Sequence, residues 1–474
     1  MQKVTYNRVK IIATAGPACK DPAVLEELIR AGVDVLRLNL SHGTWEEYDY
    51  FIGQVRRINF KLGVRVALLA DLQGPKMRIG KLDKPIPIAP GHEVIFSSKS
   101  GGDEIIPVEY ETLARDVSPG DVILVEDGRV RLRVLETDGV QMVRLQVLAG
   151  DRIGSRKGIN LPGRPISLPT ISEKDWDDLL EVAHRQIEWV AISFVRRPED
   201  VQEVRYFLRR MGASTHIMAK IERPEALEHL ERIAAVSDAI MVARGDLGVE
   251  VPIEEVPLWQ KKIIRTCHRL GKPVVVATQM LETMIQNASP TRAEVTDIAN
   301  AVLDGADAVM LSGETSVGAY PVEAVQQMQR ILMAAETEPT IYRLAGHPDA
   351  ESPTYLSDAV CWTACTLASE VRAKALVGLT YSGYTAFQLA RWRPKTDIFI
   401  FTSNPRILTI LNLLWGVRAY YYRKEEATYP TIYDILHIMR DMGHVRTGDV
   451  VIFTVSMPLQ ARQRTNTLHI AHVP

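Results

Sequence analysis

Short apolar runs alternate with longer amphipathic stretches along most of the chain. The apolar runs predict buried strands, and the stretches in which apolar residues recur every three or four positions predict helices. The predicted strands cover residues 10–15, 33–39, 65–70, 189–194, 216–222, 239–243, 273–278 and 307–311, and the helices cover 22–31, 44–62, 172–186, 198–211, 224–235, 254–270, 290–305 and 321–335. Eight strands alternating with eight helices are typical of a (β/α)8 TIM barrel, whose functional residues lie at the carboxyl ends of the strands.

The third predicted strand and the third predicted helix are too far apart for a barrel loop. Residues 73–160 instead contain short strands separated by turn pairs such as Pro119-Gly120 and Asp138-Gly139, which are typical of hairpins. We therefore predict a small all-β domain inserted into the barrel, which then comprises residues 1–72 and 161–341. Because βα loops emerge at the carboxyl ends of the strands, this domain is expected to act as a movable lid there. An insertion with no such role is the alternative.

A separate domain is predicted at the C-terminal end. Residues 337–353 contain three prolines and several polar residues, as a linker would. Strand and helix patterns then alternate again, which indicates an open α/β sheet domain over residues 354–474.

Charged residues stand at the ends of two neighbouring predicted strands. Lys220 and Glu222 are two positions apart, so they project from the same face of their strand. The next strand runs into Arg244-Gly245-Asp246, and parallel strands place these ends side by side. Two carboxylates beside a cation suit Mg²⁺ and a phosphorylated substrate. A surface salt bridge between Lys220 and Glu222 is the alternative. The other polar residues at predicted strand ends are Arg37, Asn39, Asp71 and Thr278.

Composition excludes several classes of function. The net charge of −2 over 474 residues speaks against general binding of nucleic acid or of a membrane surface. The sequence has no apolar leader and no run long enough to span a membrane. Its four cysteines show neither a disulfide framework nor a zinc-type spacing. We expect a soluble, reduced, cytoplasmic protein.

Ten longer segments resemble a single family. They are KIIATAGPA (10–18), VLRLNLSHG (35–43), LLADLQGPKMRIG (68–80), GSRKGINLPG (154–163), VAISFVR (190–196), MAKIE (218–222), MVARGDLGVE (241–250), GKPVVVATQMLETM (271–284), PTRAEVTDIANAVLDGADAVMLSGET (290–315) and YPVEAV (320–325). These segments resemble those of pyruvate kinases. The resemblance implies transfer of a phosphoryl group from phosphoenolpyruvate to ADP, giving pyruvate and ATP in the last step of glycolysis. It also implies a regulatory C-terminal domain and a homotetramer.

The residues themselves indicate how such a site would work. Lys220 would lie against the transferring phosphoryl group and then the enolate oxygen. Glu222 and Asp246 would hold Mg²⁺ or Mn²⁺, Arg37 would bind phosphate, and the N–H groups of Gly245 and Asp246 would bind the substrate carboxylate.

Further roles are implied by the resemblance alone. Thr278 would lie near the carbon that is protonated, where it would orient a water. Arg78 and Lys157 would contact the nucleotide phosphates from the two ends of the lid, with Asn39 and His42 nearby. A capping or hydrogen-bonding role is the alternative for His42.

The segment Asp71–Lys76 departs from the potassium-dependent members of the family. Those members have Thr and Lys in place of Leu72 and Gln73, and Glu in place of Lys76. Their K⁺ ligands are the residues matching Asn39, Ser41 and Asp71 and the backbone carbonyl matching that of Leu72. We expect the ammonium of Lys76 to replace the ion, so that K⁺ is not required. A Lys76 side chain that points to solvent is the alternative.

A second departure lies in the C-terminal domain. The segment 380–385 resembles the family's loop for an effector phosphate, with Thr380, Ser382, Gly383 and Thr385 as the expected ligands. The partner loop, residues 456–466, lacks the usual glycines. We therefore expect a sugar monophosphate or AMP as effector in place of a sugar bisphosphate. Whether Arg462 and Arg464 bind the effector or close the site stays open.

Two other functions fit parts of the pattern. A Mg²⁺-dependent carbon–carbon lyase acting on pyruvate-like substrates would use similar carboxylates, but it would need neither Lys220 as a phosphoryl ligand nor nucleotide contacts at Arg78 and Lys157. A non-catalytic sugar-phosphate sensor would not need an intact Lys220, Glu222, Asp246 and Thr278.

Overall fold

The computed structural model describes residues 6–75, 77–99, 105–126, 128–164, 166–342, 346–423, 428–458 and 463–474. None of the helices in these ranges is long and apolar enough to cross a membrane.

Eight parallel strands close into a barrel, which confirms the predicted (β/α)8 fold. Around the barrel they are β1 (Lys10–Thr14), β2 (Val35–Asn39), β3 (Ala67–Asp71), β12 (Trp189–Ile192), β13 (His216–Ile221), β14 (Ala239–Ala243), β15 (Val274–Ala277) and β16 (Ala308–Met310). Most of their side chains are apolar on both faces, and Arg37, Asn39, Asp71 and Lys220 are polar exceptions near their carboxyl ends. One face packs in the barrel interior and the other packs against the surrounding helices, as expected for parallel strands covered on both sides.

The helices around the barrel follow the predicted order, with one interruption. They are α1 (Pro22–Ala31), α2 (Trp45–Leu62), α4 (Glu173–His184), α5 (Pro198–Arg210), α6 (Pro224–Glu228), α7 (Leu230–Val236), α9 (Val256–Leu270), α10 (Arg292–Asp304) and α12 (Pro321–Ala335). The helix predicted over 224–235 is wrong as a single element, because His229, at φ −103° and ψ 14°, separates α6 from α7. The short helices η1 (Pro17–Cys19), α8 (Arg244–Glu250), η2 (Ile253–Glu255), η3 (Glu282–Ile285) and α11 (Gly313–Ser316) lie in the loops.

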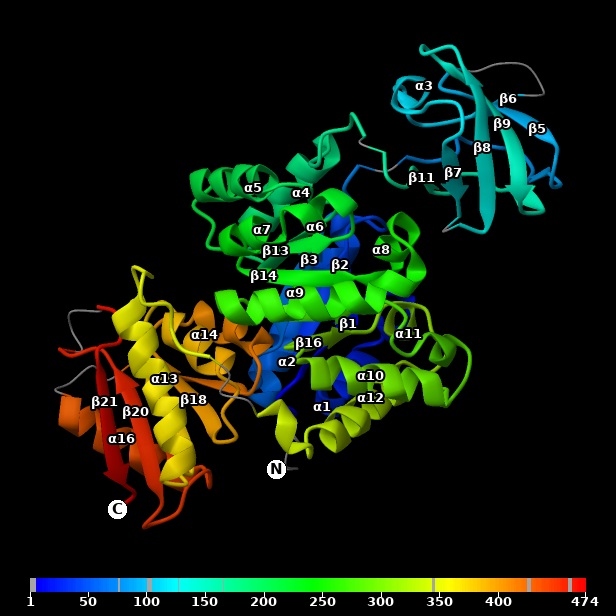
Figure 1. Ribbon diagram of the computed structural model, residues 1–474. Helices are drawn as coiled ribbons and strands as arrows, with labels where there is room; N and C mark the ends of the chain where they lie inside the picture. The colour runs from blue at the N-terminus through cyan, green and yellow to red at the C-terminus, as the bar shows by residue number, and fades with distance from the viewer. Residues whose placement is uncertain are drawn as a thin grey trace.

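The inserted β domain has its own hydrophobic core and extends away from the barrel (Figure 1). Its main sheet has the order β11 (Ile159–Asn160), β7 (Val122–Val125), β8 (Val130–Thr137), β9 (Met142–Ala149), β5 (Glu93–Ser97) and β6 (Ile105–Pro107). The strands β4 (Ile86–Pro87) and β10 (Arg152–Ile153) form a second pair, and α3 (Leu113–Asp116) completes the domain. We retain residues 73–160 as the proposed limits of this lid domain.

The C-terminal domain lies at the opposite end of the barrel from the lid (Figure 1). Its sheet has the order β19 (Val417–Tyr421), β18 (Asp397–Thr402), β17 (Ala375–Leu379), β20 (Val450–Val455) and β21 (Thr467–His472). One face packs against α13 (Tyr355–Glu370) and α14 (Tyr384–Arg391), and the other packs against α16 (Thr428–Asp441). The short helices η4 (Pro339–Ile341), α15 (Ile407–Ile410) and η5 (Leu411–Leu413) lie near the junction with the barrel.

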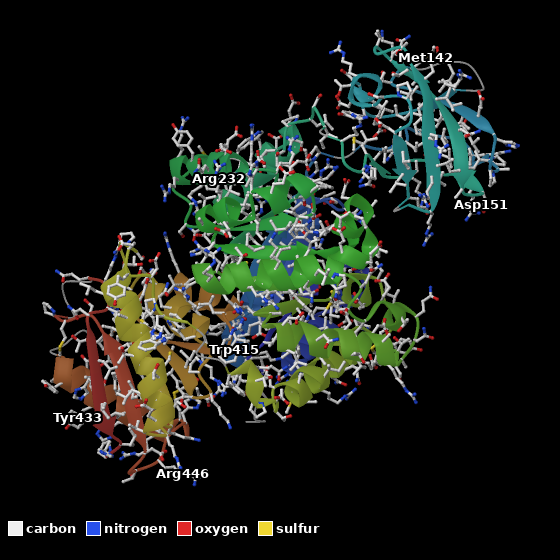
Figure 2. All side chains as sticks on the ribbon, viewed as in Figure 1. Met142, Asp151, Arg232, Trp415, Tyr433 and Arg446 are labelled. Atoms are coloured by element: carbon white, nitrogen blue, oxygen red, sulfur yellow. The ribbon has the colours of Figure 1, made fainter. Side chains whose placement is uncertain are left out.

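The C-terminal domain closes the amino-terminal mouth of the barrel. Ile410 and Leu413 belong to the same buried cluster as the apolar side chains of the barrel interior. Figure 2 places Trp415 where the two units meet, and this side chain is buried in the cluster between strands and helices. The side chains of Thr409 and Asn412 add hydrogen bonds to Glu188 and to the Asp34 carbonyl. The junction is therefore a continuous core with a polar border.

Candidate active site

Lys220 is the centre of the charged cluster at the carboxyl ends of the barrel strands. It is only 9% exposed, and its Nζ donates to Ser193 Oγ at 2.8 Å. The same nitrogen lies 2.9 Å from Glu222 Oε1 and 3.2 Å from Asp71 Oδ1. Burial alone would lower the pKa of Lys220, but the charges of Asp71, Glu222 and Asp246 raise it above its usual value. The site thus holds a buried, fully charged ammonium.

Asp71 joins this ammonium to Arg37. Arg37 Nε donates to Asp71 Oδ2 at 2.6 Å, and Arg37 Nη1 donates to Thr14 Oγ1 at 3.1 Å. Burial alone would raise the pKa of Asp71, but Lys220 and Arg37 hold it below the usual range. Because two of its nitrogens are anchored in this way, the guanidinium of Arg37 has a fixed orientation at the end of β2.

Glu222 and Asp246 form a pair of carboxylates beside Lys220. Glu222 is fully buried, and its Oε2 accepts from the Phe194 N–H at 2.8 Å. Its Oε1 accepts no hydrogen bond, although Lys220 Nζ lies close to it. Burial raises the pKa of Glu222, and the negative charge of Asp246 raises it further. A divalent cation between the two carboxylates would relieve both effects, so this donor set fits a metal.

The protein side chains alone do not complete a metal site. Among the described residues, no group of three or more His, Cys, Asp or Glu side chains is placed to hold an ion. Mg²⁺ commonly takes only one or two carboxylates and completes its shell with water and substrate oxygens. Glu222 and Asp246 therefore suit a cation that is shared with the substrate.

Thr278 lies in a strained loop that faces the start of α8. Its φ of 71° is in the left-handed region, which is unusual for a β-branched residue. Its Oγ1 accepts from the Gly245 N–H at 2.8 Å and donates to the Ala277 carbonyl. The Gly245 N–H that was expected to face the substrate carboxylate is thus used by Thr278 in this arrangement.

Three residues that were not singled out from the sequence hold this loop and its neighbour in place. Arg244 binds Asp297 with Nη1 at 2.8 and 2.7 Å, and its Nη2 donates to the Thr278 carbonyl at 2.7 Å. Ser193 accepts from Lys220, and Phe194, at φ 56°, supplies the N–H bound by Glu222. The position of Ser193-Phe194 at the end of a predicted strand was the signal that could have identified them.

A cavity of about 360 Å³ lies between the lid and the barrel. It is lined by Arg78 and Lys157 from the lid and by Asp246 from the barrel, so the predicted nucleotide ligands share one space with one member of the carboxylate pair. Lys157 Nζ lies 2.7 Å from Glu126 Oε1, and this lid carboxylate lines the same cavity. Its walls carry further cations from both units, namely Arg129, Arg156 and Arg223.

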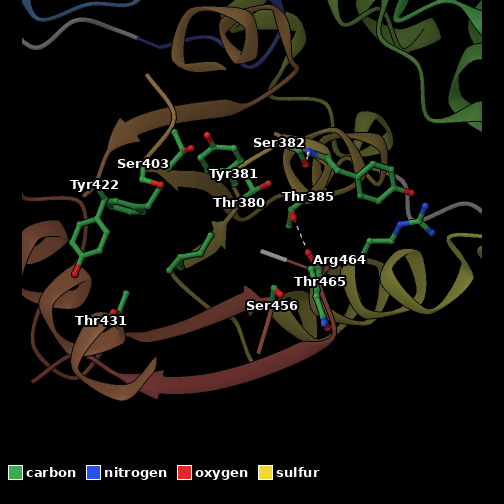
Figure 3. A pocket seen from close by; sticks show the side chains of 15 residues that line it. Thr380, Tyr381, Ser382, Thr385, Ser403, Tyr422, Thr431, Ser456, Arg464 and Thr465 are labelled. Atoms are coloured by element: carbon green, nitrogen blue, oxygen red, sulfur yellow. Dashed lines mark hydrogen bonds between the residues drawn. The ribbon is translucent and has the colours of Figure 1, made fainter. Parts of the chain in front are cut away.

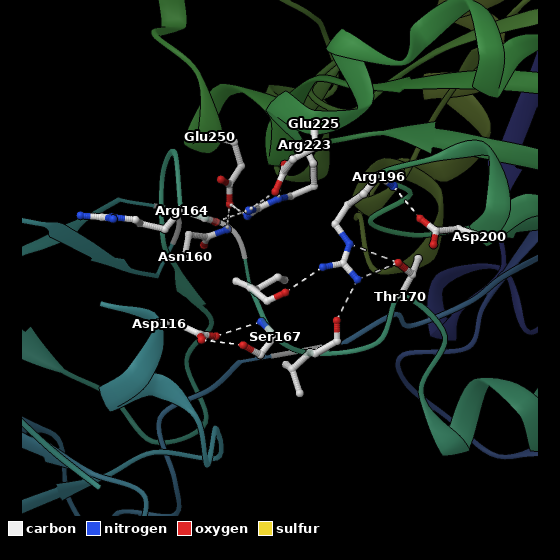
Figure 4. Close-up of polar contacts among 12 residues, drawn as sticks. Asp116, Asn160, Arg164, Ser167, Thr170, Arg196, Asp200, Arg223, Glu225 and Glu250 are labelled. Carbon is white, nitrogen blue, oxygen red and sulfur yellow. Dashed lines mark hydrogen bonds and ion pairs between the residues drawn. The ribbon is translucent and has the colours of Figure 1, made fainter. Parts of the chain in front are cut away.

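The returning connection from lid to barrel is held by two arginines of the barrel (Figure 4). Arg196 donates to the carbonyls of Ile166 and Leu168, both at 2.8 Å, and to Thr170 Oγ1. Arg223 donates to the Arg164 carbonyl at 2.8 Å and pairs with the buried Glu250, also at 2.8 Å. These contacts fix the segment that follows β11 against the barrel.

The other predicted residues lie around the end of β2 and β3. Asn39 Oδ1 accepts from the Ser41 N–H at 3.3 Å, and the exposed His42 accepts from Tyr48 through its carbonyl. The Leu72 carbonyl already accepts from Ser193 Oγ at 2.8 Å. Lys76, the predicted replacement for K⁺, lies outside the described residues.

A separate pocket of about 170 Å³ lies in the C-terminal domain (Figure 3). The segment 380–385 and residues 456 and 463–465 line it, so the two predicted effector loops face each other. Thr385 and Thr465 share a hydrogen bond of 2.7 Å, and Gly383 has a φ of 88°. Arg464 lines the pocket and donates to the Pro353 carbonyl, whereas Arg462 lies outside the described residues.

Comparison with known proteins assigns the family. The profile of the pyruvate kinase barrel domain matches residues 6–325, and that of the pyruvate kinase alpha/beta domain matches residues 358–471. A pyruvate kinase of Mycobacterium tuberculosis H37Rv is 40% identical over 98% of both chains. One of Staphylococcus aureus MRSA252 is 39% identical over 98% of this chain and 80% of its own length. A crystal structure of a pyruvate kinase from Cryptosporidium parvum superimposes with a TM-score of 0.92 and 34% identity over 99% of this chain and 96% of that one. The chain belongs to the pyruvate kinase family, whose members are phosphotransferases.

Proposed function

We propose that this chain transfers the phosphoryl group of phosphoenolpyruvate to ADP through the cluster around Lys220. The observation that carries the proposal is the ammonium of Lys220, buried and charged beside Asp71, Glu222 and Asp246. A fixed positive charge stabilises negative charge that develops on the transferring phosphoryl group and on the enolate oxygen. Arg37, oriented by Asp71, binds the phosphoryl oxygens from the neighbouring strand.

The remaining groups hold the substrates. Glu222 and Asp246 bind Mg²⁺, or Mn²⁺, and such an ion neutralises charge on carboxylate and phosphoryl oxygens when bound. Gly245 and Asp246, at the start of α8, present N–H groups to the substrate carboxylate, with Thr278 Oγ1 exchanging its bond to Gly245 for one to substrate or water. Arg78 and Lys157 bind the nucleotide phosphates from the lid side of the cavity. Asn39, at the end of β2, and His42 complete the proposed nucleotide site.

The test is an assay that couples pyruvate formation to lactate dehydrogenase. With phosphoenolpyruvate, ADP and Mg²⁺ present, we expect pyruvate to form, and omission of ADP or Mg²⁺ should abolish its formation. Pyruvate formation that does not depend on ADP would show hydrolysis of phosphoenolpyruvate by a phosphatase and would contradict the proposal. A carbon–carbon lyase would form no pyruvate from phosphoenolpyruvate under these conditions. Absence of any activity, with ligand effects confined to the C-terminal domain, would favour a non-catalytic sensor.

For the monovalent cation we propose that Lys76 supplies the charge that K⁺ supplies in potassium-dependent relatives. The matching ligand positions are Asn39, Ser41, Asp71 and the Leu72 carbonyl. Two unit charges about 4 Å apart at an effective dielectric constant of about 20 interact by about 4 kcal/mol, so an ammonium there would exclude K⁺.

This proposal is tested by exchanging KCl for tetramethylammonium chloride at constant Mg²⁺ and ionic strength. We expect equal initial rates in the two salts, and Lys76→Glu should create a requirement for K⁺. Strong activation of the unchanged protein by K⁺ would refute the proposal.

We propose that the pocket of the C-terminal domain accepts one phosphate group, from a sugar monophosphate or AMP. Thr380, Ser382 and Thr385 supply hydroxyls, and Gly383 lets the backbone N–H groups approach a phosphate. Arg464 is the only cationic side chain among the described residues that line the pocket. A single cation balances the charge of a ligand with one phosphate group better than that of a ligand with two phosphate groups. The pocket volume of about 170 Å³ also favours a small ligand.

Kinetics with glucose 6-phosphate, ribose 5-phosphate, AMP and fructose 1,6-bisphosphate test this pocket. We expect at least one monophosphate to lower the phosphoenolpyruvate concentration at half-maximal rate, and Ser382→Glu to remove the effect. Activation by the bisphosphate alone would contradict the proposal. We also propose a homotetramer, which mass photometry tests directly.

A further inference from the structure

A large basic cavity lies at the junction between the barrel and the C-terminal domain. Its volume is about 550 Å³, within the usual range for small-molecule sites. The end of α9, the loop after α10, residues 340–341 and 346–347 of the linker, and the end of α14 form its walls. Figure 1 shows the end of α9 beside α14, and Arg391 Nε donates to the His268 carbonyl there at 3.0 Å. Arg269 and Gly305 line the cavity and lie a few residues before β15 and β16, so the cavity is at the barrel face opposite the active site.

The walls carry more positive than negative charge. Five permanently cationic side chains line the cavity, against one carboxylate, that of Asp304; they are Lys261, Arg265, Arg269, Arg391 and Arg393. Lys261 pairs with Asp304, and Arg269 pairs with Glu231. In the part of the chain that the structure describes, neither Arg265 nor Arg391 has a carboxylate within salt-bridge distance. At least these two arginines thus have no counter-ion among the described residues.

Arg391 and Arg393 are held in the wall rather than free in solvent. Arg393 is 5% exposed and pairs with Asp307 at 3.0 Å, yet its Nε is buried without a hydrogen-bond partner. Burial lowers the pKa of both guanidinium groups below the usual value. Other N–H groups of Arg391 donate to the His268 and Arg269 carbonyls, and those of Arg393 donate to the Gly305 and Ala306 carbonyls. A bound anion would offset the desolvation of these charges.

We propose that this cavity is a second anion site, which binds a small phosphate-bearing metabolite between the barrel and the C-terminal domain. Guanidinium forks match phosphate oxygens in pairs, and several of them converge here. The site differs from the pocket at residues 380–385, which has one described cationic lining residue and about a third of the volume. Helix α14 joins the two sites, because Tyr384 and Thr385 line the first and Arg391 lines the second. Its eight residues span about 12 Å.

Site-resolved arginine modification tests the proposal without relying on turnover. The full chain is treated with phenylglyoxal in the presence of AMP, glucose 6-phosphate or inorganic phosphate, and the modification rate of each arginine is measured by peptide mass spectrometry. Arg265 is the reporter because its side chain is exposed. Arg57 is the matched control, since it is exposed on α2 and its side chain donates to Gln54 Oε1, its one acceptor among the described residues.

We expect one of the three probes, at about ten times its Kd, to slow modification of Arg265 about tenfold and to leave Arg57 unchanged. The probe that protects Arg265 from modification shows whether the phosphate group that binds the cavity belongs to a nucleotide, to a sugar phosphate or to free phosphate. Equal rates at Arg265 with and without all three probes at millimolar concentrations would overturn the proposal. Loss of protection in Ser382→Glu would also overturn it, because the effect would then originate in the other pocket.

A variant pair provides a second measurement. Arg265→Gln removes one expected phosphate contact, and we expect about tenfold weaker protection at Arg269. Lys262→Gln removes a charge from the same helix at an exposed position that does not line the cavity, and it should leave that protection unchanged. Equal weakening in both variants would show only a general effect of net charge and would overturn the assignment.

Discussion

Among single residues, Lys220 has two roles: its ammonium neutralises the buried carboxylates of Asp71 and Glu222, and it is proposed to stabilise charge during phosphoryl transfer. Substitution can separate these two roles. Lys220→Met keeps the length of the side chain but removes the ammonium beside Asp71 and Glu222. We expect the barrier of the chemical step to rise by about 3 kcal/mol or more, which lowers kcat by more than a hundredfold. The buried carboxylates left without a partner should also lower the stability.

Lys272→Met is the matched control for that loss of stability. Lys272 is also a mostly buried lysine of the barrel, but it precedes β15 at the opposite face, where its Nζ donates to the Ser237 carbonyl at 2.6 Å. We expect both variants to have a lower Tm and only Lys220→Met to lose turnover. If kcat fell equally in both at a temperature where both are folded, Lys220 would have no special part in the reaction.

The alternation of Lys220 and Glu222 around Ile221 was sufficient to predict that their side chains meet. Strand periodicity fixes which side chains share a face, and the apolar runs fix which strands are buried. The positive φ values of Phe194 and Thr278 had no such signal, because nothing in their local sequence favours that conformation. It is imposed by contacts distant in sequence, such as those from Arg244 to Thr278 and from Phe194 to Glu222.

At the level of elements, the returning connection of the lid depends on one guanidinium. Arg196 binds two carbonyls and one hydroxyl between residues 166 and 170, and a lysine cannot reproduce that fork. For Arg196→Lys we expect about tenfold faster hydrogen exchange of backbone amides in this segment, because about 1.5 kcal/mol or more of hydrogen bonding to a charged group is lost. We also expect a higher KM for ADP, since the lid carries Arg78 and Lys157.

The neighbouring Arg197 is the control for this prediction. Among the described residues, its exposed side chain pairs with the Asp200 carboxylate alone, at 3.6 Å. Arg197→Lys should therefore leave both the exchange rates and the KM for ADP unchanged. Unchanged exchange of residues 166–170 in Arg196→Lys would show that other contacts hold the connection.

The elements that sequence predicted well are those with a strong local pattern. The barrel strands are continuous apolar runs, and the strand pair β8 and β9 is joined by Asp138-Gly139, where Asp138 Oδ1 accepts from three N–H groups. The division of one predicted helix into α6 and α7 at His229 had no such marker, since the apolar spacing continues through it. The basic cavity could not be foreseen either, because its arginines come from two segments that lie more than a hundred residues apart in the sequence.

For the whole molecule, the junction between barrel and C-terminal domain should make stability depend on pH. Burial, with a further contribution from Arg393, lowers the pKa of His268 to about 3, and its Nε2 lies 2.8 Å from the Gly305 carbonyl. The unfolded chain binds a proton at His268 below about pH 6.5, whereas the folded chain does not. This contribution to stability is therefore complete above pH 6.5 and is lost as the pH falls toward 3, by at most about 1.4 kcal/mol per pH unit.

The measurement is Tm between pH 7 and pH 5 for the unchanged chain and for His268→Gln. We expect the decrease in Tm to be smaller in His268→Gln. His347→Gln, at an exposed position of the same junction, should behave as the unchanged chain does. An identical decrease in all three proteins would exclude His268 as the source.

Ile410 and Leu413, which close the amino-terminal mouth of the barrel, connect the C-terminal domain with the barrel interior by packed side chains. A conformational change in the C-terminal domain could therefore be transmitted to the active site. Gly383 of the proposed effector loop lies close to the segment 407–413 that closes the barrel, since a Cβ added to Gly383 would lie 3.3 Å from Leu411 Cδ2 and 3.7 Å from Ile407 Cδ1. Leu413 in turn packs with Trp189, Met218 and Met241 inside the barrel, on the strands that end near Lys220. A ligand that shifts the effector loop would thus act on the barrel interior through packed side chains.

Leu413→Ala tests this route. Removing a buried leucine typically costs about 2–5 kcal/mol, and here the loss falls on the contact between the two units. By calorimetry we expect the C-terminal domain to unfold at a lower temperature than the barrel, as a separate transition, and activation by an effector to decrease.

Leu389→Ala is the control, because Leu389 is equally buried but, among the described residues, belongs to a cluster within the C-terminal domain. It should lower the stability of that domain while effector activation persists below its Tm. Full activation in Leu413→Ala would show that the signal reaches the active site by another path, such as contacts between subunits.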